Sequence, residues 1–206
     1  AYSDIASGLA DTVLVVNPEL TSPHNDFTLR DSHFIFGDAC VATIVQRDSK
    51  SVIRAKIIDR KLVTKFSNNI RSDFGYLNIV EEPPKDQKDL FFKQNGKSVF
   101  KEVCPMVASL IMDQLDGLNI AVSDISQFWL HQANANMSRL IVSKILGTSD
   151  FDSDMAPMIL GEFGNVASAG SLLSYHLNNK LKEGDKGIIC SFGAGYSICS
   201  LVIERA

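Results

Sequence analysis

Two short polar motifs in the second half of the sequence carry the side chains best suited to chemistry. His131 lies in FWLHQANANM and Asn165 lies in GEFGNVASAGS, and each motif follows an apolar segment that predicts a buried strand. Polar residues that follow strands of an open α/β sheet meet at one rim, where ligands bind. An imidazole and a carboxamide at that rim would stabilise an enolate or oxyanion, each donor being typically worth about 3 kcal/mol. We therefore expect a catalytic pair, the alternative being two loop residues that satisfy backbone groups.

Strand and helix patterns alternate around these motifs. Helices are predicted near residues 3–10, 98–115, 137–146 and 168–181, and strands at 11–20, 33–48 (two runs), 51–62, 125–130, 155–163 and 186–205 (two runs). Pro105 should kink the second helix or start a new one. Residues 64–95 are polar and predict a long surface loop. The alternation predicts an α/β protein with helices packed on a mainly parallel sheet.

An internal echo predicts a duplicated unit. FIFGDACVATIV near the start and CSFGAGYSICSLV at the end share a strand, Phe-Gly, a turn of small residues and another strand, although such patterns also recur by chance. We therefore expect residues 1–50 to be the end of one half and residues 51–206 to be a second half. The echo also predicts N-terminal residues missing before residue 1.

Composition excludes several classes of protein. The 206 residues are 45% hydrophobic with a net charge of −4, which favours a folded, soluble protein and shows no basic face for nucleic acid. The sequence has no apolar run of about 18 residues to span a membrane, and its first residues, AYSDIASGLADT, lack the basic region and long apolar stretch of a signal peptide. We expect a cytoplasmic protein with neither nucleic acid nor membrane as its partner.

The cysteines indicate neither a metal site nor a nucleophile. Cys40, Cys104, Cys190 and Cys199 show no CxxC spacing and no cluster with histidine, so no metal is expected. Small apolar packing residues in a reducing compartment are the simpler interpretation. Cys40 lies beside a glycine turn, but the sequence shows no electropositive setting that would activate its thiol.

The order and wording of five motifs resemble the type III β-ketoacyl-acyl-carrier-protein synthases. The motifs are HQANANM, GEFGNVASAG, SFGAGYS, FIFGDACVA and NGKSVFKEV, and they extend over nearly the whole chain. The wording is most similar to the β-ketodecanoyl-type branch. The resemblance implies a thiolase-like fold of α-β-α-β-α layers, usually dimeric, of which this chain would hold the end of the N-terminal half and the complete C-terminal half.

The resemblance also implies an activity in fatty acid biosynthesis. It is a decarboxylative Claisen condensation of an acyl thioester with malonyl-acyl carrier protein by a Cys-His-Asn triad. His131 and Asn165 match the His and Asn, and the Cys would lie upstream of residue 1, at the start of a helix whose amides acidify it. This chain alone would then be inactive. The implied partners are acyl carrier protein, acyl-CoA, the missing N-terminal half and a second subunit, and no cofactor is expected beyond carrier phosphopantetheine.

Two further groups of residues follow from the resemblance. The last glycine turn would line the pocket or supply an oxyanion-binding amide, although glycines serve hairpin turns regardless of function. Asn136 stands where many family members have an Arg that meets the carrier, so Arg139 and Lys144 are the candidates for an acidic carrier protein, against a simply solvated helix face. The candidate turn residues are Phe192, Gly193, Ala194 and Gly195.

Three other hypotheses remain open from sequence. The same fold and triad could make a signalling or secondary metabolite. A catalytically silent partner subunit would carry Ser, Ala or Gln in place of the upstream cysteine. A plain α/β interaction module would leave the ordered match of five motifs unexplained.

Overall fold

The structure is a computed structural model that describes residues 1–30, 33–48, 55–75, 84 and 86–206. Its largest sheet has four strands in the order β3-β8-β7-β6, formed by β3 (Ala55–Ser67), β6 (Ile125–Leu130), β7 (Lys186–Gly193) and β8 (Gly195–Arg205). Among the described residues of this sheet, β6 and β7 form the one parallel pair, because β7 turns directly into β8 and β3 pairs antiparallel with β8. The α/β prediction is confirmed, but the expectation of a mainly parallel sheet is wrong.

Two long helices cover one face of this sheet and enclose the main core. They are α2 (Gly96–Gly117) and α3 (Ala135–Leu146), which contact each other. The apolar residues of α2 recur at three and four, so that Val103, Val107 and Ile111 are buried. Pro105 lies inside α2, which continues through it as one helix. The Oδ1 atom of Asn95 caps the helix by accepting from the Ser98 amide at 3.2 Å.

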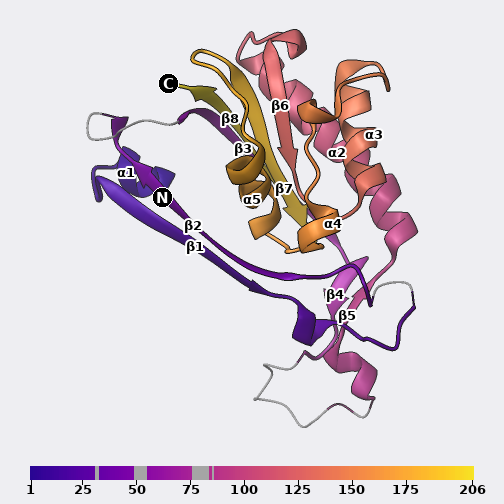
Figure 1. The fold of residues 1–206 in the computed structure, drawn as a ribbon. Helices are drawn as coiled ribbons and strands as arrows, with labels where there is room; N and C mark the ends of the chain where they lie inside the picture. The colour runs from indigo at the N-terminus through magenta and orange to yellow at the C-terminus, as the bar shows by residue number, and fades with distance from the viewer. Residues whose placement is uncertain (31–32, 49–54, 76–83, 85) are drawn as a thin grey trace.

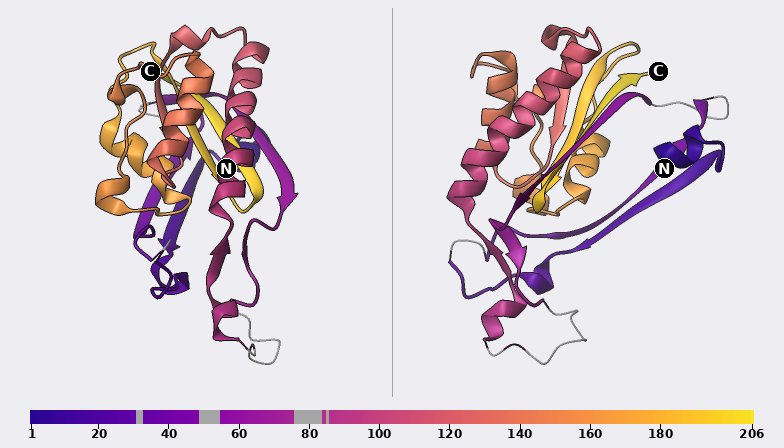
Figure 2. Two further views of the ribbon diagram at one scale, coloured as in Figure 1. Left: turned by 90° about the vertical axis from the view of Figure 1, so that its right-hand side faces the viewer. Right: turned by 180° about the vertical axis from the view of Figure 1, so that it is seen from behind.

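The other face of the sheet packs against α5 (Ala169–Asn178), which lies between two sheets (Figure 1). The second sheet is an antiparallel pair, β1 (Thr12–Leu20) and β2 (Asp38–Gln46), and α5 contacts both of these strands as well as β6 and β7. The two sheets diverge from the end near α4, as the front and rear views agree (Figures 1 and 2). The layers are therefore β1–β2, α5, the four-stranded sheet, and α2 with α3.

The remaining elements are short. In the described ranges they are α1 (Tyr2–Ala6), β4 (Ile70–Ser72), β5 (Phe92–Gln94), α4 (Leu160–Phe163) and single-turn 3-10 helices at Ser22–His24, Gln87–Leu90, Val122–Asp124 and Ser153–Met155. The predicted loop at 64–95 is wrong in part, because β3 runs on to Ser67 and β4 pairs with β5. The predicted boundary at residue 50 and the strand start at 51–54 lie outside the described residues. Within the described ranges, no helix is both long and apolar enough to cross a membrane.

Candidate active site

His131 lies where β6 ends and the chain turns toward α3, as the sequence predicts. Its amide donates to the Cys190 carbonyl at 2.8 Å, which extends the pairing of β6 with β7 by one residue. Asn134 then caps α3 by accepting from the amide of Asn136 at 2.9 Å. The arrowheads of β6 and β7 in Figure 1 point to the side of the sheet where α4 lies, so His131 is at the carboxyl end of the parallel strands.

The imidazole of His131 is buried and neutral at neutral pH. The residue is 8% exposed, and burial lowers the pKa of its imidazole from 6.5 to about 4, although a hydrogen bond with the Ala167 backbone and the charge of Glu19 both act to raise that pKa. The ring packs edge-on against Phe192, with centroids 5.0 Å apart. Its Nδ1 atom is buried and has no hydrogen-bond partner among the described residues. A buried nitrogen without a partner is costly unless a ligand or water occupies the site.

Asn165 reaches its position differently from the prediction. The expected strand at 155–163 is absent, and this stretch forms a 3-10 turn, an extended piece with Pro157 and the helix α4. The amide of Asn165 donates to the Ile35 carbonyl at 2.6 Å, and its carbonyl accepts from the Gly37 amide at 3.1 Å. The junction was therefore misassigned, because Asn165 is positioned by pairing with residues 35–37 rather than by a preceding strand.

Two glycines allow this backbone seam to form. A Cβ on Gly37 would stand 1.9 Å from the Phe163 carbonyl oxygen, which no rearrangement of side chains would relieve. Gly164 has φ +68°, a conformation that favours glycine, and its own Cβ would press on residues 35–37 at 3.1–3.2 Å. The backbone of residues 164–165 and that of residues 35–37 therefore approach each other closely.

His131 and Asn165 are brought together at the backbone of Ala167. The Oδ1 atom of Asn165 accepts from the Ala167 amide at 3.1 Å, and the backbone of Ala167 interacts with the His131 ring. Ala167 itself has φ +46°, so this tight turn is strained for an L-residue. Within the part of the chain that the structure describes, the Nδ2 amide of Asn165 has no hydrogen-bond partner. We call residues 165–168 the Asn165–Ser168 segment.

Gln132 links the two motifs, which sequence reasoning missed. Its side chain is 1% exposed and donates to the Leu130 carbonyl at 2.9 Å, while its Oε1 atom accepts from the Ile159 amide at 3.0 Å. Gly170 of α5 packs on it so closely that a Cβ would lie 3.2 Å from the Gln132 side chain. The one available signal was a polar residue next to His131 in a segment that is otherwise buried.

Ser168 stands at the N-cap position of α5 but does not cap the helix with its side chain. Instead, both its hydroxyl and its amide donate to Glu19 of β1. Glu19 therefore contacts the Asn165–Ser168 segment from 149 residues away in sequence. No local sequence pattern would have revealed this contact.

The last glycine turn lies beside His131 through Phe192. Phe192 is buried, and Gly193 ends β7. Ala194 is exposed between the two strands, and Gly195 begins β8 with φ +134°, where a Cβ would meet the Ser197 amide at 2.8 Å. The conformation thus requires glycine at position 195, which hairpin geometry explains without a ligand.

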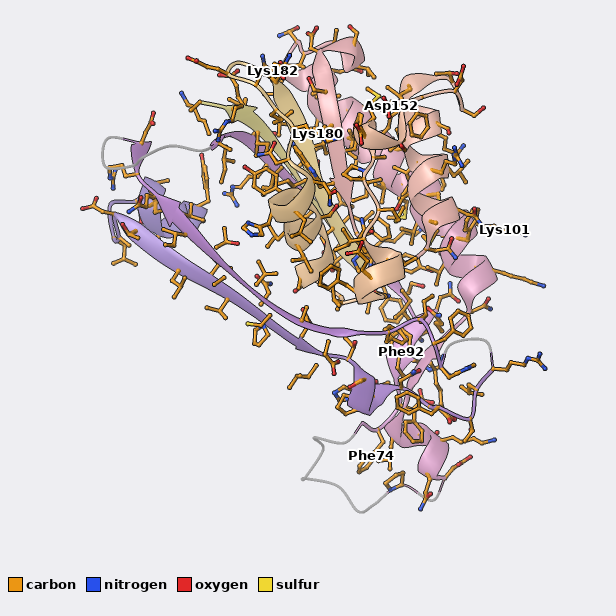
Figure 3. All side chains as sticks on the ribbon, in the orientation of Figure 1. Phe74, Phe92, Lys101, Asp152, Lys180 and Lys182 are labelled. Atoms are coloured by element: carbon orange, nitrogen blue, oxygen red, sulfur yellow. The ribbon has the colours of Figure 1, made fainter. Side chains whose placement is uncertain are left out.

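The predicted carrier-binding residues lie on the solvent side of α3. Asn136, Arg139 and Lys144 are all exposed. Figure 3 shows Lys101 extending outward from the neighbouring helix α2. A shallow hollow of about 320 Å³ lies at the start of α2, lined by Gly96, Lys97, Phe100 and Lys101, and includes neither His131 nor Asn165.

All four cysteines are free thiols, and burial works against ionisation of three of them. Burial raises the pKa of Cys104 to about 11, and burial also raises the pKa of Cys190 and of Cys199. Cys40 is exposed on β2, on the strand face opposite to Ala39 and Val41. Among the described residues, no cluster of three or more His, Cys, Asp or Glu side chains could hold a metal ion.

Two family models match successive parts of the chain. The model of the 3-oxoacyl-[acyl-carrier-protein] synthase III matches residues 1–65, and the model of the C-terminal part of the same synthase matches residues 115–205. The chain belongs to the 3-oxoacyl-[acyl-carrier-protein] synthase III family. The resemblance read from the five motifs is confirmed, and His131 and Asn165 both lie in the part matched by the C-terminal model.

Relatives within this synthase III family agree with the assignment. The chain is 46% identical over 208 residues to the β-ketodecanoyl-[acyl-carrier-protein] synthase of Pseudomonas aeruginosa PAO1, covering all of this chain and 59% of that protein. It is 29% identical to the β-ketoacyl-[acyl-carrier-protein] synthase III of Latilactobacillus sakei, covering 94% of the chain and 60% of the relative. The chain therefore spans about three fifths of the length of these curated relatives.

Solved structures show the fold of the synthase III family. The crystal structure of a 3-oxoacyl-(acyl-carrier protein) synthase from Burkholderia xenovorans LB400 superposes with a TM-score of 0.82 at 22% identity, over 99% of this chain and 59% of that one. The thiolase-like fold class is thereby confirmed. The two sheets that diverge around α5 are the part of that architecture present in this chain (Figure 2).

Proposed function

We propose that these residues are the His-Asn part of a condensing enzyme that joins an acyl thioester to malonyl-acyl carrier protein with loss of carbon dioxide. The observation that carries this proposal is the pairing of a buried, neutral His131, whose Nδ1 has no partner among the described residues, with Asn165 across the Ala167 backbone. The β-ketodecanoyl-[acyl-carrier-protein] synthase to which the chain is 46% identical supports this choice of substrate class.

The proposed chemistry uses both side chains as hydrogen-bond donors. When the malonyl C–C bond breaks, carbon dioxide leaves without the electron pair of that bond. The pair stays on the malonyl carbon as an enolate, whose negative charge lies on the thioester oxygen. Asn165 donates an N–H of its side-chain amide to that oxygen, and His131 donates the single N–H of its neutral ring, in the tautomer that carries the proton on the nitrogen facing the oxygen; such bonds are stronger in a buried setting than in water. The enolate carbon then attacks the acyl carbonyl held on a cysteine, and the thiolate leaves.

The nucleophilic cysteine of this proposal lies outside residues 1–206. Burial raises the pKa of Cys104, Cys190 and Cys199, which disfavours their thiolates, and Cys40 is exposed on β2. The substrates are carried on phosphopantetheine and no other cofactor takes part. The chain alone should then form no acyl-enzyme.

The proposed carrier dock is the exposed cationic face of α3, with Arg139 and Lys144. An acidic carrier protein would be attracted to it electrostatically, so binding should weaken as salt rises.

We also propose a homodimer, because the outer face of β1–β2 exposes apolar side chains that further chain or a second subunit would cover. Those side chains are Leu14, Val16, Leu20 and Ile44.

Intact mass and condensation assays on the full-length gene product test this function. We expect His131→Ala and Asn165→Ala to form the acyl-enzyme from acyl-CoA normally but to condense it with malonyl-acyl carrier protein roughly 100-fold more slowly, as for loss of one oxyanion donor. Arg139→Ala, on the surface of α3, is the control that should affect only carrier affinity. Condensation within a few fold of the wild type in both variants would refute the proposal, and a wild type that never forms an adduct would favour the silent partner subunit.

A further inference from the structure

Glu19 and Asn17 extend from the inner face of β1 toward the start of α5. They are two residues apart, so they share one face of the strand while Pro18 between them faces outward. The Nδ2 atom of Asn17 donates to the Ser168 hydroxyl at 2.9 Å. That hydroxyl donates in turn to the Glu19 carboxylate, which also accepts from the Ser168 amide at 3.2 Å. Three polar groups therefore join β1 to the end of the Asn165–Ser168 segment.

This contact takes the place of a local helix cap. The first amides of a helix have no partner within it, and a carboxylate there is favoured by both hydrogen bonding and the helix dipole. Because the Ser168 side chain does not cap α5, the Glu19 carboxylate supplies this acceptor from another layer of the fold. Its charge also reaches the His131 imidazole, where it opposes the effect of burial.

The Asn165–Ser168 segment is held at both of its ends. Asn165 is fixed at one end by pairing with Ile35 and Gly37, and Ser168 is fixed at the other end by Glu19. Ala167 lies between these two anchors, and its amide and backbone contact Asn165 and His131. A shift of Ser168 would therefore move the backbone at which the two catalytic candidates meet.

We propose that Glu19 is a positioning residue for the His131–Asn165 pair, holding the Asn165–Ser168 segment against β1 so that both side chains address one substrate oxygen. This proposal rests on the proposed function of that pair. Glu19 does not touch substrate in it. The β1 strand thus contributes to a site whose two donors both come from the second half of the chain.

The test combines kinetics of the full-length enzyme with NMR of the His131 ring. We expect Glu19→Ala to lower kcat roughly 10- to 100-fold while KM stays nearly unchanged, since small misplacements of catalytic groups cost this much. We expect Glu19→Gln, which keeps an oxygen acceptor for Ser168, to retain most of kcat but to shift the His131 titration to lower pH because the negative charge is lost. Glu183→Gln, on the exposed turn before β7, is the matched control and should change neither quantity.

Each outcome decides between a positioning role and a purely structural one. Lower thermal stability with an unchanged His131 titration in Glu19→Gln and unchanged kcat in Glu19→Ala would overturn the proposal. If Glu19→Ala does not fold, Glu19→Gln and Ser168→Ala carry the test, because either must alter the His131 titration or kcat. If His131→Ala abolishes condensation while the Glu19 variants do not affect it, this proposal alone fails. If His131→Ala has no effect, the proposed function fails.

Discussion

The His131 junction and the Asn165–Ser168 segment place two neighbouring side chains by opposite means. His131 follows directly from β6, whose pairing with β7 continues through its own amide. Asn165 follows no strand, and its backbone is held by Ile35 and Gly37 from the first fifty residues. His131 is therefore positioned within the four-stranded sheet. Asn165 is positioned by contacts between the second half of the chain and the layer that contains β1 and β2.

This difference indicates which substitutions should disturb each part of the site. The backbone of the His131 junction should survive changes in β1–β2, since its hydrogen bonds lie within the sheet and α3. The Asn165–Ser168 segment should not, since it loses its partners if residues 35–37 or Glu19 move. Four measurements would break or sharpen this comparison.

The largest expected effect is that of Gly37→Ala on the Asn165 side. The new Cβ would stand 1.9 Å from the Phe163 carbonyl oxygen, so the backbone seam must open, at a cost of about 3 kcal/mol in the free energy of unfolding. Urea denaturation measures this loss. Gly161→Ala in α4 is the control, because its Cβ would meet nothing within 4 Å. Equal stability of the two variants would contradict the role of the seam.

The second largest effect should be a loss of folding stability on acidification, caused by His131. The unfolded chain binds a proton on His131 near pH 6.5 and the folded chain only near pH 4, so the unfolded state takes up more protons between these values and stability falls as the pH drops. From pH 7 to pH 5 the loss attributable to His131 should be about 2 kcal/mol. The measurement is the difference between wild type and His131→Gln in urea unfolding at both pH values. Parallel pH dependence in the two proteins would show that His131 is not buried as a neutral ring.

Gln132→Ala tests the link between the two halves of the site. It removes the acceptor of the buried Ile159 amide, and a buried donor left unpaired costs about 1.5 kcal/mol. Thermal unfolding should show that loss, together with chemical shift changes on both the His131 and the Asn165 side. Gln94→Ala at the exposed end of β5 is the control and should stay within about 0.5 kcal/mol of wild type. Changes confined to the His131 side would mean that Gln132 links nothing.

Asn134→Ala should have the smallest and most local effect. Loss of the α3 cap costs about 1 kcal/mol and should speed hydrogen exchange in the first turn of α3 without altering the Asn165–Ser168 segment. Asn136→Ala, whose side chain is exposed on the same turn, should leave exchange there nearly unchanged. If the amide of Ala167 also exchanged faster in Asn134→Ala, the two halves would not be independent.

Much of the architecture follows from pattern alone. The period of three to four in α2, the apolar run of β6 and the Gly-Ala-Gly turn between β7 and β8 each predicted the element that the structure contains. The run at 155–163 was misassigned because its apolar residues suit a strand. In the structure, its Pro157 carbonyl and Ile159 amide are hydrogen-bonded to the side chain of Gln132 instead of to a neighbouring strand. The order of the four-stranded sheet was also hidden, since strand pairing depends on contacts distant in sequence.

The sequence by itself determined the family, the elements that carry the site and the identity of His131 and Asn165 as its candidate donors. These are properties of residue type and short spacing, which local backbone preferences translate directly into structure. Only the tertiary structure decided that the backbone of Asn165 is hydrogen-bonded to residues 35–37, that Gln132 joins the two motifs, and that Glu19 binds Ser168, 149 residues away in sequence. The physical reason is that hydrogen bonds between layers depend on how whole sheets and helices pack, and no local period records that packing.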